Sequence, residues 1–319
     1  MNNKSKKLNL YLSPELLAAA KRGSSFENLH YGWICVLNKD KKVIYKKGNI
    51  SNKTYLRSAL KPIQAIPVIE NNIKLTTKEL AVICASHSGS NIHLKILNKL
   101  IKKMKKCNLG LHDLKCGAHL LPTPLYNNCS GKHIGMLLVS KKNKWSTKNY
   151  ISPNHPLQRL ILKKIKELSE TKDINIAVDG CSAPTFSLPV INIAKMFSNF
   201  TNPENLKKYI RIISAVTKNP YLTGSKNQID SEIMRASKGR LLAKVGAEGI
   251  IAVAFNGNAM VLKIADGSFK ARSFVILRLL VKLGWLKQKE IKNSALEEIF
   301  NGKIKNHAGK IVGFYQKLF

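Results

Sequence analysis

Acidic side chains are scarce in this sequence. Its 319 residues hold 18 Asp and Glu against 54 Lys and Arg, a formal net charge of +36. Such a charge favours acidic surfaces or nucleic acid as partners. Arginine is scarce too, because it supplies only 8 of the 54 basic residues, and the lysines are spread along the whole chain. Base recognition and phosphate clamping rely on arginine, and the sequence has no dense basic block with interleaved aromatic residues. We therefore interpret the charge as a solvated lysine surface and do not expect nucleic acid as a partner.

Long apolar runs are also absent. No run approaches the roughly 18 residues that a membrane-spanning helix needs. Residues 1–23 carry lysines but lack the apolar core of a signal peptide, so we expect a cytoplasmic protein. No C-x-x-C pair occurs either, and we expect six reduced thiols, with a metal or catalytic role open for some of them: Cys35, Cys84, Cys107, Cys116, Cys129 and Cys181.

The apolar pattern predicts strands at both ends of the chain and helices between them. Residues 31–37 and 42–46 are predicted to form a hairpin, and apolar β-type runs return at 241–244, 250–255, 259–265 and 311–314. Helices are predicted over residues 80–85, 93–104, 204–216, 228–236 and 268–283, the last of them ending at Gly284, and Asn154 is expected to cap another that has Pro156 in its first turn. A short strand is predicted over 174–178.

The simplest arrangement of these elements is a single domain over residues 1–319 of the α/β (α+β) class. We expect an antiparallel sheet with flanking helices, built from residues of about 25–57 and 240–319, and a helical subdomain of about 58–239 inserted between its halves.

The sequence Arg57-Ser58-Ala59-Leu60-Lys61-Pro62 carries the first chemical signal. Proline is tolerated only in the first turn of a helix, so a helix is expected to begin close to Ser58. Ser58 and Lys61 then share one face, and a lysine with a lowered pKa can take the proton of a serine nucleophile. The S-x-x-K spacing, the hairpin before it and Lys244-Val245-Gly246 on a late strand resemble the serine β-lactamases, the penicillin-binding proteins and the related glutaminases.

Six blocks follow one another along the chain: Arg57-Ser58-x-x-Lys61-Pro62-x-Gln64, Ala85-Ser86-His87-Ser88-Gly89 with His93, Asn128-Cys129-Ser130-Gly131-Lys132-His133, Asp179-Gly180-Cys181-Ser182-Ala183-Pro184-Thr185-Phe186, Lys244-x-Gly246-Ala247-Glu248-Gly249 and Lys263-Ile264-Ala265-Asp266-Gly267. Through these blocks, most of the chain from about Tyr31 onward resembles the Rhizobium-like type of L-asparaginase II.

The resemblance implies hydrolysis of L-asparagine to L-aspartate and ammonia through two serine and lysine pairs, Ser58 with Lys61 and Ser86 with Lys244. Ser58 would be the nucleophile of an acyl-enzyme mechanism, and backbone amides of Ser58 and of the strand near Gly246 would hold the oxyanion. The resemblance also implies a zinc ion at Cys129, Lys132 and Cys181, no organic cofactor, and a homodimer. Candidate substrate-binding residues are Arg57, His87, Asn128, His133, Asp179 and Gly246.

Two alternatives stay open at this point. One is a glutaminase or β-lactam-type acyl-serine hydrolase of the same architecture, because a pocket larger by one methylene discriminates by only about 1 to 3 kcal/mol. The other is a basic binding protein without enzymatic activity. For the histidines and Cys129 and Cys181, an ordinary structural role is the competing interpretation.

Overall fold

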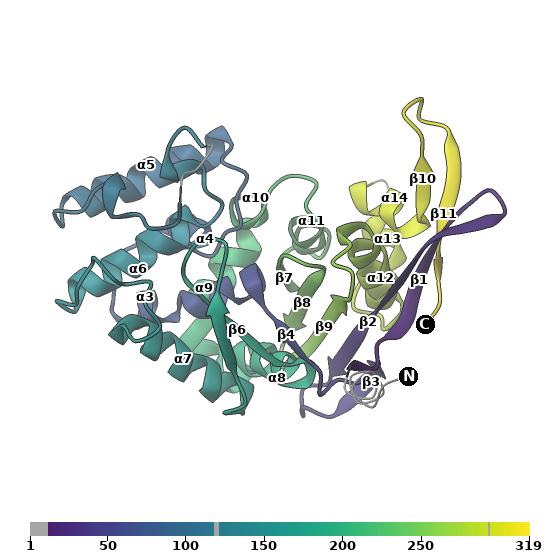
Figure 1. Cartoon of the computed structure of the whole chain (residues 1–319), viewed down its shortest axis with the longest axis horizontal. Coiled ribbons are helices and arrows are strands. Elements are labelled where there is room, and N and C mark those ends of the chain that lie inside the picture. The colour runs from purple at the N-terminus through teal and green to yellow at the C-terminus, as the bar shows by residue number, and fades with distance from the viewer. Residues whose placement is uncertain (1–11, 118–120, 293) are drawn as a thin grey trace, which may run out of the picture.

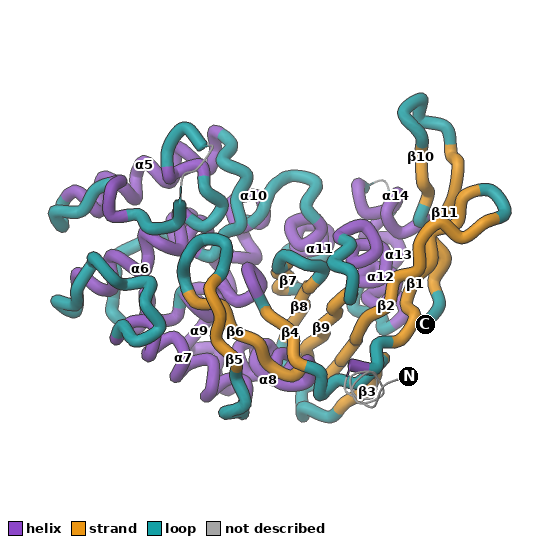
Figure 2. Tube along the Cα trace, viewed as in Figure 1, coloured by secondary structure: helices purple, strands orange, loops and turns teal. Residues whose placement is uncertain are grey.

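The computed structural model describes residues 12–117, 121–292 and 294–319. Its main feature is an antiparallel sheet in the order β10-β11-β1-β2-β9-β8-β7. Strand β3 pairs with the last residues of β2, on the side opposite β9 (Figures 1 and 2). The strands come from both ends of the chain: β1 (Glu15–Arg22), β2 (Ser25–Leu37), β3 (Val43–Lys47), β7 (Leu242–Val245), β8 (Ile250–Phe255), β9 (Asn258–Ile264), β10 (Lys303–Lys305) and β11 (Ile311–Lys317).

The centre of this sheet is apolar on both faces. Ile250 to Ala254 of β8 are all buried, and the helices that contact β8 and β9 are α8 (Val190–Thr201) and α12 (Phe269–Lys282). A strand that is buried on both faces reads as a continuous apolar run, which is why residues 250–255 show no alternation. The Asn256-Gly257 turn joins β8 to β9 with φ values of 45° and 79°, the left-handed pair that a tight hairpin turn requires.

The middle of the chain forms a helical region beside the sheet, at the left of Figure 1. It begins with the short 3₁₀ helix η1 (Arg57–Leu60), and its α-helices are α2 (Lys61–Gln64), α3 (Ile66–Glu70), α4 (Thr77–Ile83), α5 (Asn91–Lys105), α6 (Ser130–Lys142), α7 (Pro156–Ser169), α9 (Leu206–Lys218), α10 (Pro220–Thr223) and α11 (Ile229–Ala236). Short 3₁₀ turns η2 (Leu111–Asp113), η3 (Pro124–Tyr126) and η4 (Pro203–Asn205) connect some of them. After α12, the helices α13 (Gln288–Ile291) and α14 (Ala295–Asn301) lead into β10.

The helical region also contains a second, smaller antiparallel sheet. It has the order β4-β6-β5 and consists of β4 (Lys53–Tyr55), β5 (Asn175–Val178) and β6 (Pro184–Pro189). Because β4 directly precedes η1, this sheet fixes the approach of the chain to Ser58.

Most sequence predictions of elements are confirmed. The hairpin over 31–46, the strand over 174–178, the four late apolar strands and the helices near 93–104, 204–216, 228–236 and 268–283 are all present. Ala65 separates α2 from α3, with Pro67 in the first turn of α3, and Gly284 follows α12 with φ 71°.

Two local expectations differ from the structure. The cap of α7 is His155, whose side chain accepts a hydrogen bond from the amide of Leu157, so Asn154 is not the capping residue. Strand β1 was not predicted, because its sequence Glu-Leu-Leu-Ala-Ala-Ala-Lys-Arg consists largely of good helix formers. It is a strand because it completes hydrogen-bond ladders with β2 on one side and β11 on the other.

Among the described residues, no helix is both long and apolar enough to cross a membrane. The expectation that residues 1–23 hold no signal peptide falls partly on residues 1–11, which lie outside this description.

Candidate active site

Ser58 lies in the first turn of η1, directly beside the end of β7. Gly246 makes this approach possible, because a Cβ atom there would come within 2.4 Å of the Leu56 carbonyl oxygen and 3.3 Å of the Ala59 nitrogen. Arg57, just before Ser58, has φ 49°, a left-handed conformation that costs a non-glycine residue about 1 to 3 kcal/mol. The turn that presents Ser58 is therefore held by tertiary contacts.

One contact that holds the turn is the ion pair between Arg57 and Asp179. The Arg57 Nε atom lies 2.6 Å from Asp179 Oδ1, which also accepts a hydrogen bond from the Gly180 amide. Although burial opposes it, Lys132 and Arg57 lower the pKa of Asp179. Both residues of this pair were expected to bind substrate, but in this structure they bind each other, and neither lines the cavity described below.

The ammonium group of Lys61 joins three segments of the chain. Its Nζ atom lies 2.7 Å from the Ala85 carbonyl oxygen, 3.0 Å from the Asn128 carbonyl oxygen and 3.1 Å from Ser86 Oγ. Burial lowers the pKa of Lys61, as do the cations of Lys132 and Lys244, while Cys129 raises it. As an ammonium group Lys61 donates to all three oxygens, and as a neutral amine it keeps two N–H donors and gains one lone pair that can accept a proton. In the described part of the chain, no hydrogen bond joins Lys61 to Ser58.

Lys244 has a different partner from the one expected. Its Nζ atom lies 2.9 Å from Oδ2 of Asp230, and that oxygen also accepts a hydrogen bond from the Val245 amide at 3.0 Å. Lys244 and Asp230 are both fully buried. The observed contacts are therefore Lys61 with Ser86 and Lys244 with Asp230. The expected pairs were Ser58 with Lys61 and Ser86 with Lys244, and neither of these hydrogen bonds is present among the described residues.

A cavity of about 390 Å³ brings the two serines together. It takes residues from η1, from the segments after α4 and before α6, from the start of α11, from the end of β7 and from α12, and its wall consists of Ser58, Ser86, Asn128, Asn227, Gln228, Ile229, Val245, Gly246, Ala247, Phe269, Arg272 and Ser273. Of the six expected substrate-binding residues, Asn128 and Gly246 line this cavity.

Backbone amides at the cavity can stabilise a developing oxyanion. The Gly246 amide donates to the Ile250 carbonyl oxygen at 2.9 Å, so it is already used by the β7–β8 hairpin. The next residue, Ala247, donates no backbone hydrogen bond to any described residue and lines the cavity. The amide of Ser58, in the first turn of η1, has no acceptor within that helix. Ser58 and Ala247 are therefore the candidate amides.

Cys129, Lys132 and Cys181 form a buried cluster, and Cys129 directly follows Asn128 of the cavity wall. Lys132 Nζ lies 2.9 Å from Cys181 Sγ. A hydrogen bond from Cys181, with Lys61 and Lys132 nearby, lowers the pKa of Cys129 to about 4, and the same bond raises the pKa of Cys181. Across residues 12–117, 121–292 and 294–319, no group of three His, Cys, Asp or Glu side chains could hold a metal ion, so a metal here requires the amine of Lys132.

The two candidate histidines have structural partners. His87 Nε2 lies 2.9 Å from Ser130 Oγ, while its Nδ1 accepts a hydrogen bond from the Gly89 amide, and burial lowers the pKa of His87 to about 3. His133 Nδ1 lies 2.7 Å from the Tyr150 hydroxyl, and burial lowers its pKa well below the ordinary value. Neither histidine lines the cavity, so in this structure both connect neighbouring segments.

Among the residues of the site, Asp230 and Arg272 were not found from the sequence, and Ala247 was found only as part of a block, without a role. Asp230 is the second residue of α11, and an aspartate in the first turn of a helix is usually explained by the helix dipole. Ala247 contributes only a backbone amide, which no side-chain motif reveals. Arg272 lies inside the apolar run that predicts α12, and its burial depends on tertiary packing.

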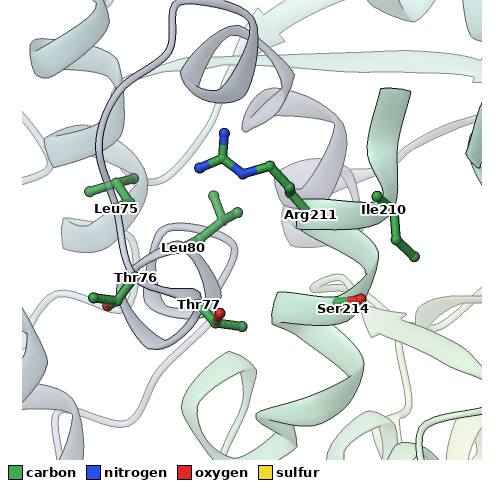
Figure 3. Close-up of a pocket in the computed structure, with 7 residues that line it drawn as sticks. All are labelled: Leu75, Thr76, Thr77, Leu80, Ile210, Arg211 and Ser214. Atoms are coloured by element: carbon green, nitrogen blue, oxygen red, sulfur yellow. The ribbon is translucent and has the colours of Figure 1, made fainter. Parts of the chain in front are cut away.

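A second hollow, shown in Figure 3, lies between the start of α4 and α9 and measures about 230 Å³. Its wall combines apolar, hydroxyl and guanidinium groups: Leu75, Thr76, Thr77, Leu80, Ile210, Arg211 and Ser214. It contains none of the residues of the six sequence blocks, so we place the candidate active site at the cavity of Ser58 and Ser86.

Comparison with known proteins gives one family. The family model described as L-asparaginase II matches residues 18–316, which include every residue named above for the site. No curated protein matches the chain.

Proposed function

Because the chain belongs to the L-asparaginase II family, we propose that it is an amidohydrolase that converts L-asparagine to L-aspartate and ammonia. The observation that carries the proposal is the cavity in which Ser58 and Ser86 meet beside the buried amine of Lys61. A hydroxyl nucleophile needs a nearby base with a lowered pKa, and Lys61 has that property through burial.

In the proposed first half-reaction, Ser58 Oγ attacks the side-chain amide carbon of asparagine. Lys61, one helical turn away, takes the hydroxyl proton. The Ser86 hydroxyl, 3.1 Å from Lys61 Nζ, gives its proton to the departing nitrogen and receives the proton held by Lys61, so that Lys61 is neutral again. The bond between Ser58 Oγ and the acyl carbon forms, the carbon–nitrogen bond breaks, and ammonia leaves.

The amides of Ser58 and Ala247 are the proposed oxyanion donors, each of a kind commonly worth about 2.7 to 4 kcal/mol. In the second half-reaction water attacks the aspartyl ester, and Lys61 takes a proton from the water. Lys61 returns that proton to Ser58 Oγ as the ester carbon–oxygen bond breaks, and L-aspartate and free Ser58 are released. Lys244 keeps the end of β7, and with it Gly246 and Ala247, in register through Asp230.

We also propose that the fold is of the serine β-lactamase and penicillin-binding-protein type. Its support is the placement of Lys244-Val245-Gly246 on a strand directly beside the Ser58 turn, with helices inserted between the halves of the sheet. A glutaminase or β-lactam hydrolase of this fold is the alternative outcome of the substrate test.

A zinc ion is proposed at Cys129, Cys181 and Lys132. Two thiol sulfurs and one amine lie together there, and soft sulfur ligands suit zinc. The amine of Lys132 can bind zinc only after it loses a proton. Burial favours that loss, but Cys129 and Cys181 raise the pKa of Lys132. When bound, the ion would cross-link the start of α6 to the loop between β5 and β6. Zinc per chain, measured by mass spectrometry of the purified protein, should fall in Cys181→Ser and stay unchanged in Cys35→Ser; equal zinc in both variants would remove the proposal.

A homodimer is the proposed assembly. Two exposed apolar side chains lie on the strands that flank β1, Phe26 on β2 and Phe314 on β11, and both are opposite Lys21 of β1. They supply a candidate surface. Light scattering of the wild type and of Phe26→Ser with Phe314→Ser tests this, and a wild-type monomer would contradict it.

The test of the function is ammonia release from L-asparagine and from L-glutamine by the wild type and by Ser58→Ala and Ser86→Ala. We expect hydrolysis of L-asparagine, loss of it in Ser58→Ala, and an aspartyl ester on Ser58 in rapidly quenched samples. An ester on Ser86 would exchange the roles of the two serines. Full activity in Ser58→Ala contradicts the mechanism, and an inactive, well-folded wild type would favour a binding protein.

A further inference from the structure

Arg272 is a buried cation of the cavity wall that the proposed reaction does not use. The residue is only 8% exposed, and it lies on α12 with Phe269 and Ser273, which occupy the same helix face and also line the cavity. A buried guanidinium is costly unless its charge and its N–H groups are matched by a partner.

Only some of the N–H groups of Arg272 have hydrogen-bond partners in the protein. Nη1 donates to the Gly246 carbonyl oxygen at 3.1 Å, whereas Nε is buried without a hydrogen-bond partner. No described residue accepts a hydrogen bond from Nη2, and no carboxylate within the described ranges forms an ion pair with Arg272. Burial lowers the pKa of Arg272 and the negative charge of Asp230 raises it, but Asp230 is hydrogen-bonded to Lys244 and to the Val245 amide instead.

The position of Arg272 relative to the nucleophile is set by one residue. Gly246 accepts the hydrogen bond from Nη1 through its carbonyl oxygen, and the same glycine packs against Leu56 and Ala59 on either side of Ser58. A ligand that binds the guanidinium therefore lies within the same small cavity as Ser58. In asparagine the α-carboxylate is separated from the side-chain amide carbon by only two carbon atoms.

We propose that Arg272 binds the α-carboxylate of the substrate and restricts the enzyme to amides that carry a carboxylate close to the scissile bond. This inference rests on the proposed amidohydrolase function and adds to it the residue that selects the substrate class. Arg57, the arginine expected for this role, is occupied by Asp179. A guanidinium whose free N–H groups point to no protein acceptor is suited to a planar carboxylate.

Three amides distinguish the contribution of the α-carboxylate from that of the α-amino group. They are L-asparagine, succinamate, which lacks only the α-amino group, and β-alaninamide, which lacks only the α-carboxylate. In the wild type we expect kcat/KM to be higher for succinamate than for β-alaninamide. In Arg272→Met, kcat/KM for the two carboxylate-bearing amides should fall at least tenfold more than that for β-alaninamide, and Arg272→Lys should recover part of the loss. Arg278→Met is the matched control, since Arg278 lies on the same helix outside the cavity and packs on Phe300.

Equal losses on all three amides would mean that Arg272 acts only by holding Gly246, and would overturn the proposal. Calorimetry with L-aspartate and β-alanine on the Ser58→Ala background gives a second measurement that needs no turnover. We expect the unsubstituted Arg272 protein to bind β-alanine more weakly than L-aspartate. Arg272→Met should weaken L-aspartate binding at least tenfold and β-alanine binding by a smaller factor. If no amide is hydrolysed but aspartate binding depends on Arg272, the proposed function fails and the carboxylate site stands. Aspartate binding that is the same in Arg272→Met overturns the site.

Discussion

Lys244 Nζ and Asp230 Oδ2 lie 2.9 Å apart and form an ion pair in which both side chains are fully buried. Asp230 lies on α11 and Lys244 on β7, so the pair joins the helical region to the sheet. The same carboxylate accepts a hydrogen bond from the Val245 amide at the end of β7, and Ala247, whose amide is proposed for the oxyanion, follows two residues later. Asp230 is thus a positioning residue for one wall of the site.

Replacing Asp230 by Asn keeps the volume and removes the negative charge. Breaking a buried ion pair from one side commonly costs about 3 to 5 kcal/mol, because the remaining charge is left buried and unpaired. We expect a loss of this order in the free energy of unfolding, measured by urea denaturation, and a smaller loss in Asp230→Asn combined with Lys244→Met. A double variant that is as unstable as the sum of the two single variants would show that the two charges do not interact.

Substituting Gly246 by Ala tests the contact between β7 and the Ser58 turn. The new methyl group would lie 2.4 Å from the Leu56 carbonyl oxygen and 2.5 Å from the Ile250 side chain, so η1 or β7 has to move. A displacement of about 1 Å at a reacting group can lower a rate by about a hundredfold. We expect kcat to fall by that order in a folded protein. Gly180→Ala is the comparison, because its methyl group would meet only Arg57 Nη2 at 3.8 Å, and an equally large loss there would speak against the proposed contact.

The sequence predicted those parts of the fold that depend on local pattern. The apolar runs of β8 and β9, the Asn256-Gly257 turn and the proline at the start of α2 each have one local solution, and the structure contains all three. Strand β1 shows the limit of such reasoning, since its alanine-rich sequence has helical propensity and only its neighbours β2 and β11 make it a strand.

In the site, too, the sequence located some residues but not their partners. The S-x-x-K spacing placed Ser58 and Lys61 on one turn, and the ordered blocks brought Ser86 and Gly246 to the same cavity. The partners of buried charges could not be obtained from spacing: Lys61 contacts Ser86, Lys244 contacts Asp230, and Arg57 contacts Asp179 across 122 residues of sequence. Such pairs depend on which elements meet in three dimensions.

The buried imidazole of His87 makes stability depend on pH. Burial lowers its pKa from 6.5 to about 3, so between these values the unfolded chain binds a proton that the folded chain does not. Stability is therefore retained above pH 6.5 and lost as the pH falls toward about 3. One such proton gives a slope of about 1.4 kcal/mol per pH unit, and we expect His87→Gln to reduce the measured slope by about that amount. His307→Gln, at an exposed turn, is the control, and the same slope in wild type and His87→Gln would contradict the assignment.

The pH dependence of turnover tests Lys61 as the base. Because only the neutral amine can accept the Ser58 proton, kcat/KM is expected to rise with pH through the pKa of Lys61, which burial lowers. The thiolate of Cys129 raises that pKa, so Cys129→Ser should move the acidic limb of the profile to lower pH. Both proteins are measured with a chelator, so that a metal at Cys129 does not contribute to the difference, and Cys35→Ser serves as the matched thiol control. A limb that stays in place, or that moves to higher pH, would show that the titrating group is not Lys61.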